Sequence, residues 1–321
     1  MRLFVCLGAL AFVASGLEWT QLNRAWARSD KFLLAVAFTV FLPVLFLQSL
    51  RFAWMLKAQS IPLGYWESLK LSCTGNFLNN FVPAGLVGGD VIKAYYVARH
   101  TAQKTEAITA VVLDRVVGLF VLALIALVGL CVTIDWEVRY LGWASGAVAL
   151  VALVTFAAIL LRRTDAVLSA KQWLRRAPGG EQLSRIKSAT LQLHDRWPLT
   201  LAAVLATVVS HSVILSAFTV AAIALGMSSD FVVHFAFLAI SLVVAAIPIS
   251  PAGLGTMEAA MTFLYVREGM GDPEQVILLA LCLRAIQLLW ALPGGALFLT
   301  GACRPRPVNL PKLETNAVAE I

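Results

Sequence analysis

Long uninterrupted apolar runs dominate the pattern of hydrophobic and polar positions along the chain. A helix that crosses a hydrocarbon layer of about 30 Å needs ~20 mainly apolar residues. The short alternating runs typical of a transmembrane barrel do not describe this pattern. The periodicity predicts apolar helices at residues 3–22, 32–54, 106–134, 140–161, 198–225 and 275–300.

Two further segments have a different pattern. Residues 64–104 and 231–266 each contain an apolar helix, a break rich in Pro and Gly, and a second short helix. We expect each segment to form a re-entrant hairpin that enters and leaves the membrane on one side. The predicted fold is an all-α polytopic membrane protein with about six full spans and two broken hairpins.

Composition strengthens the membrane interpretation. Of the 321 residues, 60% are hydrophobic and only 13% are charged, whereas soluble domains are about a quarter charged. We expect one membrane domain at residues 1–303, followed by a short disordered tail at 304–321. The N-terminus resembles a signal peptide, but an uncleaved first span is favoured because more spans follow it.

Charged residues in the loops predict an orientation. Segment 162–196 is strongly basic and amphipathic, which favours a cytoplasmic location on the membrane surface, and the tail is basic too. Both termini are then cytoplasmic, with the first hairpin opening from the cytoplasm and the second from outside. Arg24, Arg28 and Lys31 contradict this arrangement, since they would lie outside. The net charge of +7 is explained by loop bias, so we expect no nucleic-acid partner.

The two breaks resemble each other. Pro83 and Pro251 each begin the sequence Pro-Ala-Gly-Leu, and an acidic residue follows seven positions after each proline, at Asp90 and Glu258. The long helix after each hairpin carries a single arginine. These arginines are Arg115, 32 residues after Pro83, and Arg284, 33 residues after Pro251.

The matched positions predict an internal repeat with units at about 32–134 and 198–300. Because the two hairpins are expected to open from opposite sides, the repeat would be inverted. Inverted repeats are common in secondary transporters, where a central site faces each side of the membrane in turn. Pro83 and Pro251 would then mark the breaks where the helices hinge.

The breaks are candidate binding sites because broken backbone in a membrane must lie against protein or water. Helix N-termini there offer N–H donors to an anion, and Asn79 and Asn80 either cap the broken backbone or contact a headgroup. Glycine lets the backbone turn tightly and approach a ligand, or merely lets helices pack closely. The glycines concerned are Gly85, Gly88, Gly89, Gly253 and Gly255.

Arg115 and Arg284 are predicted to lie near the middle of the membrane, where an uncompensated arginine costs at least ~2.5 kcal/mol. One interpretation gives them ion-pair partners, Asp90 or Asp114 for Arg115 and Glu258 for Arg284. The other gives them a phosphate-bearing substrate, because a guanidinium group binds phosphate oxygens through two parallel hydrogen bonds. The two interpretations are compatible if the pair opens when substrate arrives. The carboxylates could instead bind protons or cations for coupling.

Three motifs, at residues 79–90, 113–119 and 247–258, resemble those of the lysylphosphatidylglycerol synthase transmembrane family, the flippase-like domain family. The resemblance covers nearly the whole chain and implies lipid translocation between leaflets of a bacterial cytoplasmic membrane. Two-domain members carry a soluble aminoacyl-transferase domain after the membrane bundle. This sequence ends at Ile321 without one, so we expect no lysyl transfer.

The leading hypothesis is a flippase for an anionic phospholipid or polyprenyl-type lipid, with the residues of the two breaks as its binding site. One alternative is a membrane enzyme that modifies a lipid headgroup, with Asp90 and Glu258 as acid and base. The other is a non-transporting accessory subunit of an envelope-lipid pathway. We expect membrane lipids as partners, a homo-oligomer or envelope-lipid biosynthesis proteins as further candidates, and no metal or cofactor.

Overall fold

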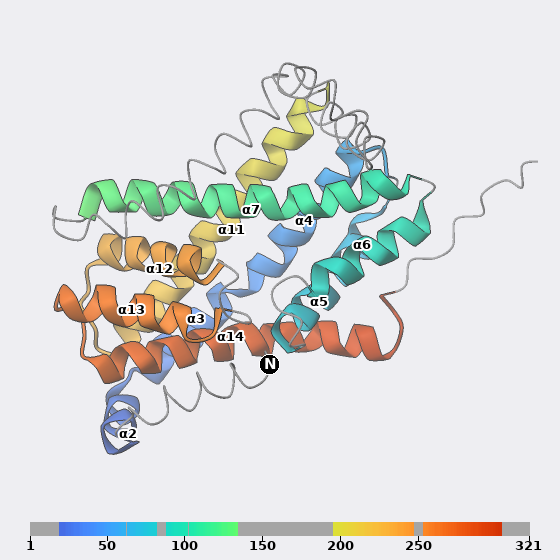
Figure 1. The fold of residues 1–321 in the computed structure, drawn as a ribbon. Helices are drawn as coiled ribbons and strands as arrows, with labels where there is room; N and C mark the ends of the chain where they lie inside the picture. Colours follow the sequence, from blue (N-terminus) through green and yellow to red (C-terminus); the bar gives the residue numbers. More distant parts are fainter. Residues whose placement is uncertain are drawn as a thin grey trace, which may run out of the picture.

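The computed structural model describes residues 19–61, 63–81, 88–101, 103–133, 195–246 and 253–303, and every regular element in these ranges is an α helix (Figure 1). Pro83, Gly85 and Pro251 lie outside the described residues. So do the expected helix 140–161, most of the expected helix 3–22, most of the basic segment 162–196, and the tail 304–321.

Four long apolar segments form the frame of the bundle. They are α3 and α4 together (Lys31–Val40 and Leu42–Ala58), α7 (Lys104–Thr133), α11 (Trp197–Ala224) and α14 (Pro273–Leu299). Each is long and apolar enough to cross a membrane. They confirm four of the predicted apolar helices, and the chain is a multi-pass helical membrane protein. Pro43 follows the short interruption between α3 and α4, where its missing N–H disturbs the hydrogen-bond ladder.

Two pairs of shorter helices occupy the predicted hairpins. They are α5 (Tyr65–Phe81) with α6 (Gly88–His100), and α12 (Phe231–Ala246) with α13 (Thr256–Arg267). Each helix is shorter than the ~20 residues needed to cross a hydrocarbon layer. The pairs lie at opposite ends of the bundle, and their broken ends point toward its middle (Figure 1). A further short helix, α2 (Trp19–Arg28), precedes α3.

Each hairpin packs against the final long helix of the other predicted unit. Helix α5 packs along α14, and α12 packs along α7. Helices α4 and α11, the first long helices of the two units, also pack along each other. The same three contacts are obtained when each helix is replaced by its counterpart in the other unit, so the packing is symmetric between the two units. Whether the units are inverted across a membrane stays a prediction.

Small residues allow the hairpins to approach their neighbours closely. A methyl group on Gly294 of α14 would lie 2.0 Å from the carbonyl oxygen of Cys73 in α5. A methyl group on Gly89 of α6 would lie 1.9 Å from the carbonyl oxygen of Gly75 in α5. Neither distance is possible for a real side chain, so glycine is required at both crossings, as is common between membrane helices. Helix α5 is thereby fixed between α6 and α14.

Candidate functional site

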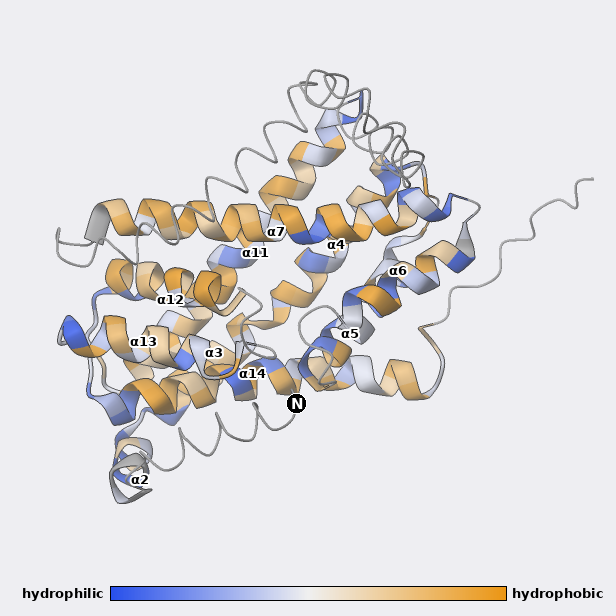
Figure 2. Cartoon of the chain, in the orientation of Figure 1, coloured by the Kyte–Doolittle hydropathy of each residue, from blue (hydrophilic) through white to orange (hydrophobic). Residues whose placement is uncertain are grey.

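Charged side chains interrupt the apolar bundle in three of its long helices. Hydrophilic positions appear within the otherwise hydrophobic α4, α7 and α14 (Figure 2). In the described residues they form three groups, which we call the first half-site (Asp90 and Arg115), the second half-site (Glu258 and Arg284) and the buried triad (Arg51, Lys93 and Asp114).

The second half-site joins α13 to α14. Nε and Nη2 of Arg284 each donate to Oε1 of Glu258 at 3.1 Å. Nη2 also donates to the carbonyl oxygen of Gly253, at 3.0 Å. The arginine side chain is 18% exposed and the glutamate 14%. The expected ion pair between Glu258 and Arg284 is therefore present, and it reaches the backbone of the second break.

The backbone at this break explains why Glu258 can reach both partners. Gly253 and Gly255 have φ angles of 68° and 82°, in the left-handed region that favours glycine. Gly255 caps α13, and its N–H donates to Oε2 of Glu258 at 2.8 Å. One carboxylate oxygen thus caps the helix while the other accepts from Arg284. The N-terminus of α13, expected to attract an anion, has the anion of Glu258 beside it.

The first half-site joins α6 to α7 in the corresponding way. Nε of Arg115 lies 3.1 Å from Oδ2 of Asp90. The side chain of Arg115 is 41% exposed, much more than that of Arg284. Asn79 accepts a hydrogen bond from the Gly89 N–H at 2.8 Å, so it caps the broken backbone, which is one of the two roles expected for it. The first half-site is the more accessible of the two.

The buried triad brings together α4, α6 and α7. Nε and Nη2 of Arg51 donate to the two carboxylate oxygens of Asp114 at 2.7 and 3.0 Å. Nζ of Lys93 lies 3.9 Å from Oδ2 of Asp114 and 4.4 Å from the ring centre of Phe52. The side chains of Arg51 and Lys93 are 11% exposed and that of Asp114 is 6% exposed.

Asp114 is therefore the partner of Arg51 and Lys93, and the expected alternative of pairing it with Arg115 is wrong. Neighbouring residues of an α helix point about 100° apart, so these two side chains lie on different faces of α7. Asn80 donates to the carbonyl and side-chain oxygens of Asn76 within α5. That bond lies inside the helix and does not cap the break. Gly88 begins α6.

Sequence reasoning missed Lys93 entirely and gave Arg51 no partner. Lys93 follows Asp90 by three positions, so both lie on one face of α6. That spacing was the available signal, but a short helix with a lysine is also typical of a membrane surface. The contact from Arg51 to Asp114 spans 63 residues, and no local pattern marks it.

The fold and these intramembrane ion pairs define a helical multi-pass membrane protein with charged groups inside its bundle. Residues 1–294 match the model of the lysylphosphatidylglycerol synthase transmembrane region. The chain belongs to that family, as its motifs indicated, and the family points to a function related to membrane lipids. The search of curated proteins found no match to the chain.

Proposed function

We propose that the protein is a lipid flippase that moves an anionic phospholipid or polyprenyl-type lipid between leaflets of a bacterial cytoplasmic membrane. The observation that carries the proposal is the pair of matched half-sites. Each joins a carboxylate in the first turn of a short hairpin helix to an arginine on the long helix that follows. Family membership supports a lipid as the substrate.

Each half-site can exchange its internal partner for a substrate phosphate. A guanidinium in a bilayer needs a counter-charge, and Asp90 or Glu258 supplies it when no lipid is present. Two oxygens of a tetrahedral phosphate can accept the same pair of parallel guanidinium hydrogen bonds that a carboxylate accepts. Exchanging one acceptor for the other leaves the arginine compensated throughout. The lipid tails stay in the bilayer while the headgroup passes between the half-sites.

The two half-sites differ in exposure, as expected if they open in turn. The Arg115 side chain is 41% exposed and the Arg284 side chain 18%. Arg284 is also bonded to the carbonyl of Gly253. Together with the reciprocal packing of α5 on α14 and of α12 on α7, this supports an inverted pair of units whose sites alternate. The structure would then represent the state with the first half-site open.

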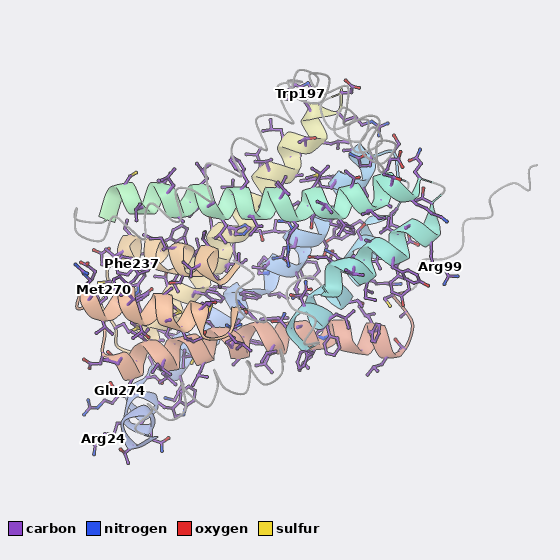
Figure 3. The ribbon with its side chains drawn as sticks, in the orientation of Figure 1. Arg24, Arg99, Trp197, Phe237, Met270 and Glu274 are labelled. Atoms are coloured by element: carbon purple, nitrogen blue, oxygen red, sulfur yellow. The ribbon has the colours of Figure 1, made fainter. Side chains whose placement is uncertain are left out.

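Charges at the ends of the bundle support the proposed orientation. Arg24 and Glu274 lie at one end and Arg99 at the other (Figure 3). The ends of α3, α12, α13 and α14 meet at the end with Arg24 and carry acids, which are Asp30, Asp230, Glu268, Asp272 and Glu274. These acids balance the bases Arg24, Arg28, Lys31 and Arg267 there. At the other end, Arg196 contacts the Lys57 carbonyl where the basic segment 162–196 ends. We therefore place the Arg99 end in the cytoplasm.

Transport in proteoliposomes tests the proposal. The protein is reconstituted with a fluorescent phosphatidylglycerol, and the label in the outer leaflet is measured by chemical quenching over time. We expect Arg115→Ala and Arg284→Ala each to lower the rate at least about tenfold, since each removes a charge-assisted contact to phosphate. Matched controls are Arg99→Ala and Arg267→Ala, exposed arginines near the far ends of α6 and α13, which should keep the wild-type rate.

Two results would count against the proposal. Equal rates for all five proteins would remove both arginines from the pathway. A changed lipid mass after incubation, measured by mass spectrometry, would instead indicate an enzyme that modifies the headgroup.

A further inference from the structure

We propose that Lys93, together with hydroxyl groups of α5, forms an anion-binding site for the phosphodiester of a lipid headgroup whose net charge is −1. This inference deepens the proposed function, and it rests on that function for the identity of the ligand as a lipid. The site lies in the first unit, where α5, α6 and α7 meet, and it is separate from the carboxylate–arginine pairs of the two half-sites.

Charge balance is the first argument. The buried triad contains two cations and one carboxylate, so it carries one excess positive charge. Both oxygens of Asp114 accept from Arg51, at 2.7 and 3.0 Å. Lys93 lies 3.9 Å from that carboxylate, beyond ordinary hydrogen-bond distance. An anion would neutralise the excess charge, and a buried charge is costly until it is neutralised.

The surroundings of the ammonium group are the second argument. The Phe52 ring lies 4.4 Å away and contributes a cation–π contact, but a ring face accepts no ordinary hydrogen bond. An ammonium group has three donors. Neither contact of Lys93 therefore provides an acceptor at bonding distance, and phosphate oxygens would provide them.

Buried hydroxyls on α5 are the third and independent argument. Among the described residues, the hydroxyls of Ser68 and Ser72 are buried without a hydrogen-bond partner. They lie seven and three positions before Gly75, and this spacing places all three on one face of α5. A methyl group on Gly75 would lie 2.8 Å from Cδ of Lys93, so the lysine stem crosses α5 on that face. Ser72, one turn from Gly75, is the hydroxyl closest along the helix to an anion held there, and Ser68 lies one further turn, about 6 Å, along the same face.

The second unit lacks this site. The position that corresponds to Lys93, ten residues after the proline of the break, is Met261 in the second unit, and Met261 is fully buried. The headgroup is therefore held by an additional cation only in the first unit. Such an asymmetry would select for anionic lipids at one stage of the cycle.

Direct binding tests the inference independently of transport. The full chain in detergent is titrated calorimetrically with short-chain phosphatidylglycerol, with short-chain phosphatidylcholine and with inorganic phosphate. We expect wild-type protein to bind phosphatidylglycerol best and Lys93→Met to bind it about tenfold or more weakly. Lys93→Arg, which keeps the charge, should bind phosphatidylglycerol more tightly than Lys93→Met does. Arg99→Met is the control for general loss of surface charge.

A second variant moves the ammonium group without removing it. Gly75→Ala places a methyl group 2.8 Å from Cδ of Lys93, so it should displace the ammonium group and weaken phosphatidylglycerol binding, and thermal unfolding is measured beside it to show that the variant is folded. It keeps the test informative if Lys93→Met fails to fold. Weaker binding by Lys93→Met and Gly75→Ala, with phosphatidylcholine unaffected, would support the site.

Three results would overturn the inference. They are wild-type affinity in both folded variants, equal wild-type affinity for phosphatidylglycerol and phosphatidylcholine, and no binding of phosphatidylglycerol by wild-type protein. Binding of inorganic phosphate as tight as that of phosphatidylglycerol would assign the same chemistry to free phosphate instead of lipid. Loss of phosphatidylglycerol binding in Lys93→Met, with no transport by wild-type protein, would support the binding site and contradict the flippase. Transport that depends on Arg115 and Arg284 but not on Lys93 would support the flippase and contradict the binding site.

Discussion

The buried triad predicts that replacing Asp114 destabilises the protein more than replacing Arg51 does. Asp114→Asn removes the counter-charge of both Arg51 and Lys93, and removing one member of a buried ion pair costs about 3–5 kcal/mol. Arg51→Met leaves Asp114 with Lys93, 3.9 Å away. At an effective dielectric constant of about 20, that remaining attraction is worth about 4 kcal/mol. The loss is then mainly that of the charged hydrogen bonds, about 1.5–3 kcal/mol.

The measurement is the free energy of unfolding in mixed micelles, followed by circular dichroism during a denaturant titration. Arg99→Met serves as a control, since Arg99 is exposed and a surface change of this kind is worth within about 0.5 kcal/mol. We expect Asp114→Asn to be the most destabilising of the three. If Arg51→Met destabilises the protein as much as Asp114→Asn or more, Lys93 does not act as a second counter-charge, and the reasoning about the triad is refuted.

Two further predictions concern packing and the second half-site. Gly294→Ala should lower the free energy of unfolding by about 1–3 kcal/mol, because its methyl group would meet the Cys73 carbonyl. The control is Gly64→Ala, whose methyl group has only an ordinary 3.6 Å contact and should change the free energy of unfolding little. Equal effects of the two variants would contradict the close helix crossing. Glu258→Gln should cost about 1–3 kcal/mol in the same assay by removing the counter-charge of Arg284, and adding Arg284→Met should recover part of that loss. A fully additive double variant would show that the two side chains do not interact.

Much of the fold could be predicted from the sequence because bilayer-spanning helices have a strong local signal. Continuous apolar runs placed α7, α11 and α14 within two residues at each end. The two breaks were visible because Pro and Gly close together disfavour a continuous helix, although α14 continues through Pro293 and Gly294. The sequence also predicted that Glu258 would pair with Arg284, because an arginine within an apolar helix needs a counter-charge and the two residues repeat, to within one residue, the offsets of Asp90 and Arg115 from Pro83.

The rest depended on distances in space that no local pattern encodes. Arg51 and Asp114 lie on different helices, and only the packing of α4 on α7 brings them together. Asp114 adjoins Arg115 in sequence, which suggested a pair that helix geometry forbids. The sequence pattern predicted no role for Lys93, which the tight crossing of α5 and α6 at Gly75 and Gly89 buries. These residues could be placed only once helix packing was known.

The central claim is that a single lipid pathway uses both half-sites in turn. The most direct test compares transport of phosphatidylglycerol in proteoliposomes by the wild-type protein, by Arg115→Ala, by Arg284→Ala and by the double variant. If the lipid must pass both half-sites in series, the transport rate of each single variant should already fall to near that of protein-free vesicles. The double variant should then be no slower than either single variant. Single variants that each keep about half the wild-type rate, with loss only in the double variant, would contradict the account, and so would a wild-type rate in all of them.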